Sequence, residues 1–271
     1  MSNDAVRPSH LPDFRKPPLN EVVLGVQFSP PEAYQQIFAG DVWNLYRNDF
    51  PKVQEQPPLP PSFETFGLPT KSRPFDFVTG ATHDRFWFLR PDGEELIQFQ
   101  QDRLLHNWRK VGDESNPYPR FEVMVNSFHR ELEQLERYMQ GLSPQALAIN
   151  QCEVSYINHI APLNDQALLA SEWLRFISFF GKEPDDFTMA FREAIYDAEN
   201  RPIGRLICEA SVAIKSNRQR VIQLTLTVRG APQQNTIASG LEFLKNGRDL
   251  IVSRFAQLTT DEAHKNWERI K

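Results

Sequence analysis

Regular alternation of apolar and polar residues in two stretches of the second half sets the strongest limit on the fold of this chain. In residues 203–215 every second side chain is apolar or small, with polar side chains such as Arg205 and Glu209 between them, and residues 220–229 repeat the pattern. A period of two residues places the two kinds of side chain on opposite faces of a strand. We therefore expect an antiparallel sheet with one face on the core and the other exposed to solvent.

Residues 17–28 predict the central strand of this sheet. They read Pro-Pro-Leu-Asn-Glu-Val-Val-Leu-Gly-Val-Gln-Phe. The two prolines exclude a helix before Leu19, and the β-branched residues that follow favour a strand. After Glu21 both faces are nearly uncharged, so we expect this strand to lie inside the sheet and to be covered on both sides. Burial of Glu21 there would raise a functional question, because burying a carboxylate is costly.

Serine and proline residues mark the expected helix boundaries and an extended stretch in the segment that follows. Ser29 is expected to cap a helix that closes at Phe50-Pro51. Residues 53–74 include Pro57-Pro58-Leu59-Pro60-Pro61 and predict an extended segment. Such a segment either wraps along the protein's own surface or serves as a ligand for an aromatic groove in a partner, and its position between folded elements favours the first interpretation.

A hairpin and a long helix complete the first half. Pro91-Asp92-Gly93 predicts a tight turn between strands at residues 85–89 and 96–99, and we expect the second strand to continue through a bend to Trp108. Apolar residues spaced by three and four then predict an amphipathic helix over residues 121–139, which ends at Gly141.

The second half repeats this order of elements. Residues 153–157 predict an opening strand, and an apolar stretch predicts a helix over residues 168–180 that ends at Gly181. Three strands follow, at residues 187–196, 203–215 and 220–229. A last helix has an apolar stripe from Ile237 to Leu258 that Arg248 interrupts.

The predicted fold class is therefore α+β, with two similar β-α-β-β-β-α units. Residues 1–16 are expected to form a flexible tail, residues 17–142 the first unit and residues 143–271 the second, packed as one compact body. We expect antiparallel sheets, each backed by the long helix that ends its unit, with a sheet continuous across the two units as the alternative.

Composition limits the location and the partners. The chain has 271 residues and a formal net charge of -5, so there is no overall basic bias toward nucleic acid. Its apolar runs are shorter than the roughly 18 residues that cross a bilayer, and its N-terminus resembles no secretory signal. We expect a cytoplasmic protein with no membrane partner. Cys152 and Cys208 are expected to be reduced and buried.

The sequence contains no recognisable catalytic or metal-binding motif. None of its six histidines forms a His-x-x-x-His pair, the two cysteines are far apart, and neither a phosphate-binding glycine loop nor Gly-x-Ser-x-Gly is present. We therefore expect no catalytic residues, no cofactor and no metal.

The best candidate for binding is the segment His106-Asn107-Trp108-Arg109-Lys110 at the end of the predicted strand, next to the loop through Tyr118. A Trp–Arg pair next to a Tyr is typical of an interface hot spot, and it can also stack on a base. The structural alternative is that Trp108 closes the core and Arg109 pairs with a carboxylate, and the residue types favour it. Glu21 completes the set of speculative binding residues.

Several stretches together resemble one protein family. They are Pro17-Pro18-Leu19-x-Glu21-Val22, the helix of Trp43 running into Asp49-Phe50-Pro51, Asn107-Trp108-Arg109, Tyr118-Pro119-Arg120-Phe121 and Tyr156-x-Asn158. On these residues the chain is similar to a sporadically distributed bacterial family of about this length, named for its N-terminal Pro-Pro-Leu-x-Glu-Val signature. The resemblance implies no catalytic residue, and a sporadic distribution suggests accessory or defence-linked genes.

Three functions are compatible with these observations. The first is a non-enzymatic binding protein for a protein partner. The second is a nucleic-acid-associated factor, with phosphate contacts from the polar sheet face of the second unit. That face carries Arg205, Lys215, Arg218, Arg220 and Arg229. The third is an enzyme or small-ligand carrier with a cavity between sheet and long helix.

Overall fold

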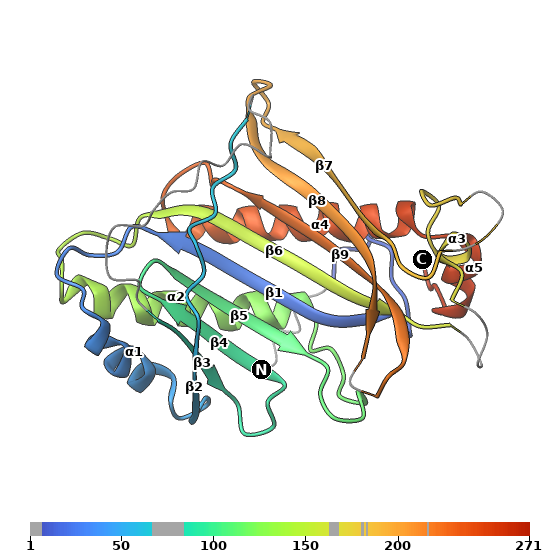
Figure 1. The fold of residues 1–271 in the computed structure, drawn as a ribbon. Coiled ribbons are helices and arrows are strands. Elements are labelled where there is room, and N and C mark those ends of the chain that lie inside the picture. Colours follow the sequence, from blue (N-terminus) through green and yellow to red (C-terminus); the bar gives the residue numbers. More distant parts are fainter. Residues whose placement is uncertain (1–6, 67–83, 163–167, 180–181, 183, 216) are drawn as a thin grey trace.

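A single antiparallel sheet organises the chain. The computed structural model describes residues 7–66, 84–162, 168–179, 182, 184–215 and 217–271, and within them the sheet has nine strands in the order β2-β3-β4-β5-β1-β6-β9-β8-β7 (Figure 1). The strands are β1 (Leu19–Phe28), β2 (Lys52–Gln56), β3 (Arg85–Leu89), β4 (Glu95–Gln100), β5 (Arg103–Arg109), β6 (Ile149–Ile160), β7 (Thr188–Tyr196), β8 (Pro202–Ile214) and β9 (Arg220–Gly230).

The predicted central strand is confirmed. β1 lies between β5 and β6, antiparallel to both, with Val22 opposite Trp108 on one side and Tyr156 on the other. Val22 and Leu24 are fully buried. Because β1 and β6 pair directly, the strands of the two halves form one continuous sheet, the alternative that the sequence left open.

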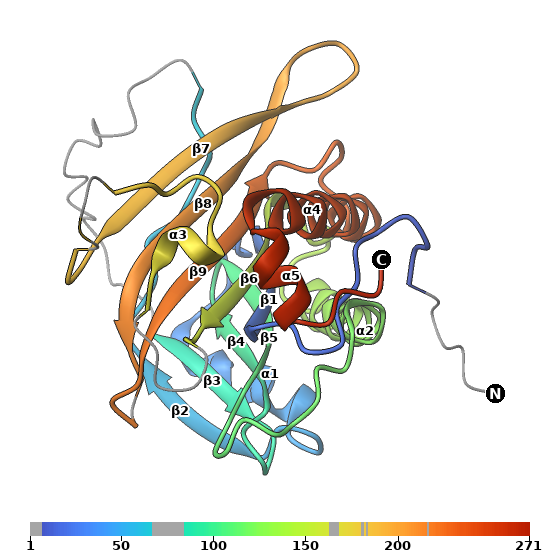
Figure 2. The same cartoon turned by 90° about the vertical axis from the view of Figure 1, so that its right-hand side faces the viewer.

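The long helices lie on one face of this sheet (Figure 2). α4 (Ile237–Leu258) contacts β6 and β9, and α2 (Phe121–Gln140) contacts β5 and α4. Arg248, which interrupts the apolar stripe of α4, is buried and joins the two helices: its guanidinium lies 3.0 Å from Glu122 and over the ring of Phe121. The shorter helices are η1 (Gln36–Phe38), α1 (Ala39–Tyr46), α3 (Ala170–Trp173) and α5 (Asp261–Asn266).

Several predicted boundaries need correction. Ser29 caps no helix, and the helical residues begin only at Gln36. Two prolines follow Ser29, and each disfavours the helical conformation in the residue before it. The strand expected to run on to Trp108 instead turns between Gln100 and Arg103, which pair with each other across a second hairpin. The expected helix at residues 168–180 is only α3, because Leu174 leaves it to form a β-bridge with Thr259. Its expected end, Gly181, lies outside the described residues.

Residues 7–16 are ordered against the body of the protein, contrary to the expectation of a flexible tail through residue 16. Leu11 and Phe14 are buried, and the ring of Phe14 packs against Phe255 of α4 and Trp267 near the C-terminus. Backbone hydrogen bonds join residues 13–16 to residues 267–270. Two apolar side chains and this pairing stabilise a segment whose average composition is polar.

Residues 57–66, which we call the strap, cross the polar face of the sheet opposite the long helices (Figure 1). The amide of Gln100 on β4 bonds both the N–H and the carbonyl of Leu59, and the amide of Gln27 on β1 does the same for Ser62. Farther along, Glu64 lies 3.0 Å from Arg205 on β8. The proline-rich stretch therefore wraps the protein's own surface, as predicted.

A buried ion-pair cluster lies between the sheet and α2. His106 on β5 is fully buried; its Nδ1 lies 2.9 Å from Glu131 of α2 and its Nε2 lies 3.3 Å from Glu95 on β4. Arg90 is 3.2 Å from the same Glu95 carboxylate. Burial lowers the pKa of His106, but the two carboxylates outweigh it and raise the pKa to about 9. The imidazole is therefore charged at neutral pH.

This cluster predicts that the protein loses stability as pH rises. The unfolded chain has a histidine pKa near 6.5 and the folded chain one of about 9, so the stabilisation is fully present below pH 6.5 and is lost as pH rises through 9. The difference corresponds to about 3 kcal/mol in the free energy of unfolding. Urea unfolding across this pH range measures it. An unfolding free energy that stays constant over the range contradicts a charged His106.

Candidate binding site

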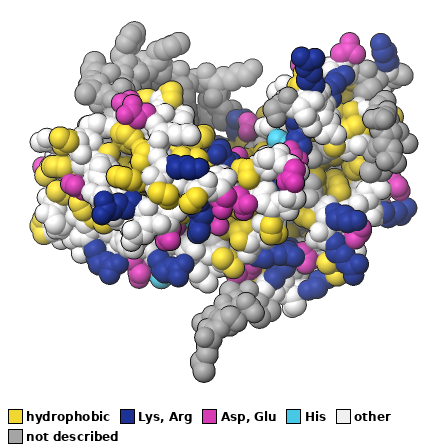
Figure 3. All heavy atoms as spheres, turned by 90° about the horizontal axis from the view of Figure 1, so that it is seen from below, with side chains coloured by type: hydrophobic (Ala, Val, Ile, Leu, Met, Phe, Trp, Pro, Cys, Tyr) yellow, Lys and Arg dark blue, Asp and Glu magenta, His cyan; other side chains and the backbone are white. Residues whose placement is uncertain are grey.

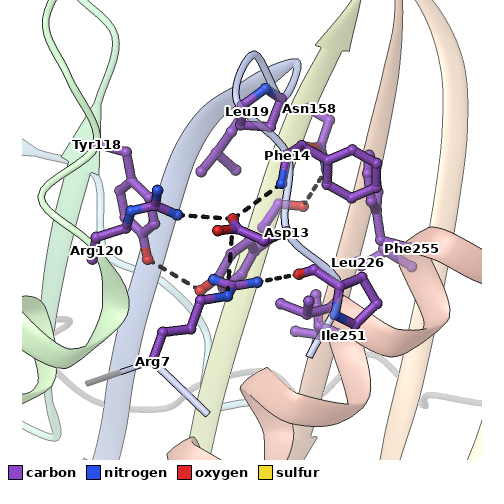
Figure 4. Close-up of a pocket in the computed structure, with 14 residues that line it drawn as sticks. Arg7, Asp13, Phe14, Leu19, Tyr118, Arg120, Asn158, Leu226, Ile251 and Phe255 are labelled. Carbon is purple, nitrogen blue, oxygen red and sulfur yellow. Dashed lines mark hydrogen bonds and ion pairs between the residues drawn. The ribbon is translucent and has the colours of Figure 1, made fainter. Parts of the chain in front are cut away.

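A small pocket lies between the sheet and α4, where the N-terminal segment crosses the start of β1 (Figure 4). Its volume is about 60 Å³, and most of its lining is apolar. The apolar residues include Phe14, Leu19, Leu226, Ile251 and Phe255. A cavity between sheet and long helix was one expectation, but a space of this size holds no more than a small group.

Polar side chains at the mouth of this pocket bond one another. Asp13 lies between Arg120, at 3.1 Å, and Arg7, at 3.9 Å (Figure 4). The hydroxyl groups of Tyr118 and Tyr156 share a hydrogen bond of 3.1 Å. Burial, and then the neighbouring Tyr156, raise the pKa of Tyr118 well above its usual value, so Tyr118 stays a neutral donor and acceptor.

Arg120 has a strained backbone. Its φ is +78°, a conformation that residues with a side chain rarely adopt. Arg120 precedes α2 directly. It lines both the small pocket and a larger cleft that adjoins the pocket. Strain of this kind costs roughly 1–3 kcal/mol and concentrates at functional sites. This part of the surface is therefore a candidate functional site.

A larger cleft of about 490 Å³ adjoins the pocket at the end of the sheet where β1 begins and β5 ends. Four of its lining side chains are cationic and one, Glu114, is anionic, so we call it the basic cleft. The cationic side chains are Arg15, Lys16, Lys110 and Arg120. Lys16 and Arg120 form exposed salt bridges with Glu268 and Asp13, which are weak in water and can be exchanged for other carboxylates.

Two buried polar atoms of cleft-lining residues have no hydrogen-bond partner among the described residues. One is the indole Nε1 of Trp108, whose side chain is 1% exposed, and the other is Nδ1 of His159. An indole N–H can only donate, and a buried donor without an acceptor costs roughly 1–3 kcal/mol. Lys110 lies over the Trp108 ring. The cleft thus combines an unpaired donor with positive charge, an arrangement suited to a carboxylate.

The four residues predicted for binding fall on two faces of the sheet. Trp108 and Tyr118 lie together on the helix side, with ring centroids 5.1 Å apart, and both line the basic cleft. Glu21 and Arg109 face the opposite side. There Asn107 donates a hydrogen bond of 2.6 Å to Glu21, and burial raises the pKa of Glu21. Arg109 bonds the carbonyl of Gly93 and lies over Trp87.

Four of the five stretches quoted for the family resemblance lie at this region; the stretch from Trp43 to Pro51 does not. Pro17, Leu19, Tyr118 and Arg120 line both the pocket and the cleft; Pro18 and Trp108 line the cleft; Tyr156 and Asn158 line the pocket. Lys110 belongs to the segment that the sequence analysis singled out. Sequence reasoning missed His159 and the N-terminal residues as members of the site, and no local signal marks them.

The arginines proposed for phosphate contacts are mostly engaged within the protein. Arg205 and Arg229 both pair with Glu64 of the strap, and Lys215 pairs with Glu114. Arg220 donates to the backbone carbonyl of Asp185. At the lower end of the molecule, Lys and Arg side chains are interspersed with Asp and Glu rather than gathered in one basic area (Figure 3). This arrangement gives the nucleic-acid hypothesis little support.

Comparison with known proteins adds no assignment: no protein-family model matches the chain, and no curated protein shows significant similarity to it. Among the described residues, no group of three or more His, Cys, Asp or Glu side chains is arranged to hold a metal ion. The described helices include none long and apolar enough to cross a membrane. Cys152 and Cys208 are unpaired and buried, and burial raises the pKa of each thiol to about 12.

Proposed function

We propose that this chain is a non-enzymatic binding protein whose basic cleft receives an acidic segment of a partner polypeptide. The observation that carries the proposal is the group of cationic side chains lining the cleft, beside the indole N–H of Trp108, which is buried without an acceptor. Arg15, Lys16 and Arg120 surround the charge of a partner carboxylate, which accepts from the indole N–H once the side chains covering it move aside.

The walls of the cleft favour a polypeptide over a nucleic acid. Tyr118 offers a partly exposed aromatic surface beside Pro17 and Pro18, and aromatic side chains are enriched where proteins bind proteins. A duplex requires many phosphate contacts along a continuous basic surface. The cationic side chains here are confined to one cleft at the end of the sheet.

A binding experiment tests the proposal. The probes are a short fluorescein-labelled peptide rich in Glu and Asp, its Gln and Asn counterpart, and a short DNA duplex, each followed by anisotropy. We expect the acidic peptide to bind and the other two not to. Trp108→Phe keeps the aromatic packing but removes the N–H, and it should weaken binding about tenfold through loss of a hydrogen bond to a charged group. The folding of this variant is checked by circular dichroism.

A matched pair of charge variants separates a specific cleft from general electrostatic attraction. Arg120→Gln should weaken acidic-peptide binding, whereas Arg47→Gln, an identical change at an exposed position after α1, should leave it unchanged. Equal losses in the two variants, or preferential binding of the duplex, would reject the acidic-peptide proposal.

We also propose that residues 17–142 and 143–271 are two similar β-α-β-β-β-α units, each backed by the long helix that ends it. The strand order supports this: from the centre outward it is β1, β5, β4, β3 in one half and β6, β9, β8, β7 in the other, and the first half adds β2 at its edge. Both series are followed along the chain by a long helix. Superposing β1, β5 and α2 on β6, β9 and α4 is the test, and helices that fail to coincide would refute it.

Membership in the bacterial family with the Pro-Pro-Leu-x-Glu-Val signature remains part of this proposal, with an accessory or defence-linked role. Its support is the convergence of four of the five shared stretches on one site. A cytoplasmic location is proposed as well, because two unpaired buried cysteines suit a reducing compartment. Fluorescence microscopy of a tagged chain in a bacterial host tests the location.

A further inference from the structure

A second cavity lies between the strap and the polar face of the sheet. Its volume is about 340 Å³, within the range of small-molecule sites, and none of its lining residues belongs to the basic cleft. Gly25 and Leu105 contribute to its sheet side, and Leu59, Pro60 and Ser62 of the strap cover it.

The cover of this cavity is fixed in place by the sheet. Gln27 donates to the carbonyl of Ser62 at 2.6 Å and accepts from its N–H at 3.0 Å. Arg103 donates to the carbonyl of Pro60 at 3.1 Å. Because these side chains hold the strap by its backbone, the cavity is formed before any ligand enters, and little ordering entropy is lost on binding.

The lining distinguishes between ligand chemistries. Arg103 pairs with Asp102, and Arg229 pairs with Glu153 and Glu64, so each lining guanidinium already has a carboxylate partner. A charged ligand would have to break one of these pairs. Leu59, Pro60 and Leu105 offer apolar surface instead.

One polar atom of the lining is unused. The side chain of Gln151 is nine-tenths buried, and its Oε1 has no hydrogen-bond partner among the described residues. An amide oxygen can only accept, so its natural partner is an N–H or O–H group. Leaving such a buried acceptor unpaired is costly. The oxygen is not exposed to the cavity in this structure, so a ligand donor recovers that cost once the amide of Gln151 rotates its oxygen toward the cavity.

We infer that the cavity under the strap binds a small neutral molecule with an apolar body and one N–H or O–H donor, which donates to Gln151. This site is independent of the basic cleft. Two pairs of probes test the inference: indole with benzofuran, and phenol with fluorobenzene. Within each pair the shape is similar, and only the first member carries the donor.

Side-chain amide resonances of Gln27 and Gln151 in the full chain report binding by NMR titration. We expect indole and phenol to bind about tenfold more tightly than benzofuran and fluorobenzene. This ratio of affinities corresponds to the cost of leaving one buried acceptor unpaired. Gln151→Leu should reduce this preference to about twofold or less. Gln140→Leu, the same change on the exposed end of α2, should keep it.

Three outcomes would overturn the inference. They are equal binding of donor and donor-free probes to the unmodified chain, a preference that persists in Gln151→Leu, and resonances that do not move with any of the four probes. Loss of acidic-peptide binding at the basic cleft leaves these readouts unaffected, so the two proposals fail separately.

Discussion

Replacing Glu131 with Gln should lower the free energy of unfolding by about 3 kcal/mol at pH 7. Glu131 holds Nδ1 of the fully buried His106 at 2.9 Å, and it is the carboxylate that contributes most to the raised pKa of that histidine. Glutamine keeps the shape and a hydrogen-bond acceptor but removes the charge. With Glu95 as its only remaining carboxylate, the imidazole has a lower pKa and is no longer held in its charged form.

The matched control is Glu133→Gln on the same helix. Glu133 is half exposed and lies 3.4 Å from His129, so its removal should change stability by less than about 1 kcal/mol. Urea unfolding at pH 7 measures both variants. The Glu131→Gln chain should also lose most of the pH dependence predicted for the unmodified protein. Equal stability of the two variants would show that the buried cluster is energetically neutral.

Replacing Gly230 with Ala should also lower the free energy of unfolding by about 3 kcal/mol. This value lies in the upper part of the range for substitutions that overpack a buried site. Gly230 on β9 pairs with Gly204 on β8. A Cβ added at Gly230 would lie 2.5 Å from the Cα of Gly204 and closer still to the carbonyl oxygen of Ile203. Both contacts are with backbone, so relief requires the two strands to separate where they also contact Phe243 of α4.

Gly40→Ala provides the control for this substitution. Gly40 lies in α1, and an added Cβ would meet nothing within 4 Å. The change should be neutral or should stabilise the protein by up to about 1 kcal/mol, because alanine reduces the entropy of the unfolded chain. Thermal or urea unfolding of the two variants gives the comparison. A destabilisation of both by the same amount would argue against a steric cause at Gly230.

Local patterns predicted elements well where one physical cause dominates. Alternation in residues 203–215 and 220–229 gave β8 and β9 almost to the residue, because a strand with one buried face must alternate. Spacing by three and four gave α2 and α4 for the analogous reason. Residues 168–180 misled because an apolar run lacks a diagnostic period, and the β-bridge of Leu174 decides its conformation.

The residues of the candidate sites were harder to predict from the sequence than the helices and strands. Trp108 and Tyr118 were singled out together and do lie together, yet Glu21 and Arg109 belong to the other face, since neighbours along a strand point in opposite directions. His106 lay in the segment that the sequence singled out, but its buried ion pairs were not predicted. Glu131 is 25 residues away and reaches it only when α2 packs on the sheet.

The sequence alone determined the class of the fold, the central position of β1 and the two long helices, because these follow from periodicity and backbone chemistry within short stretches. Only the tertiary structure decided that the strands form one sheet, through the pairing of β1 with β6. It also decided that the strap covers a cavity and that Trp108 lines one cleft with Arg15, Lys16 and His159. These features join side chains far apart in the chain, and their energies depend on distances that no local pattern encodes.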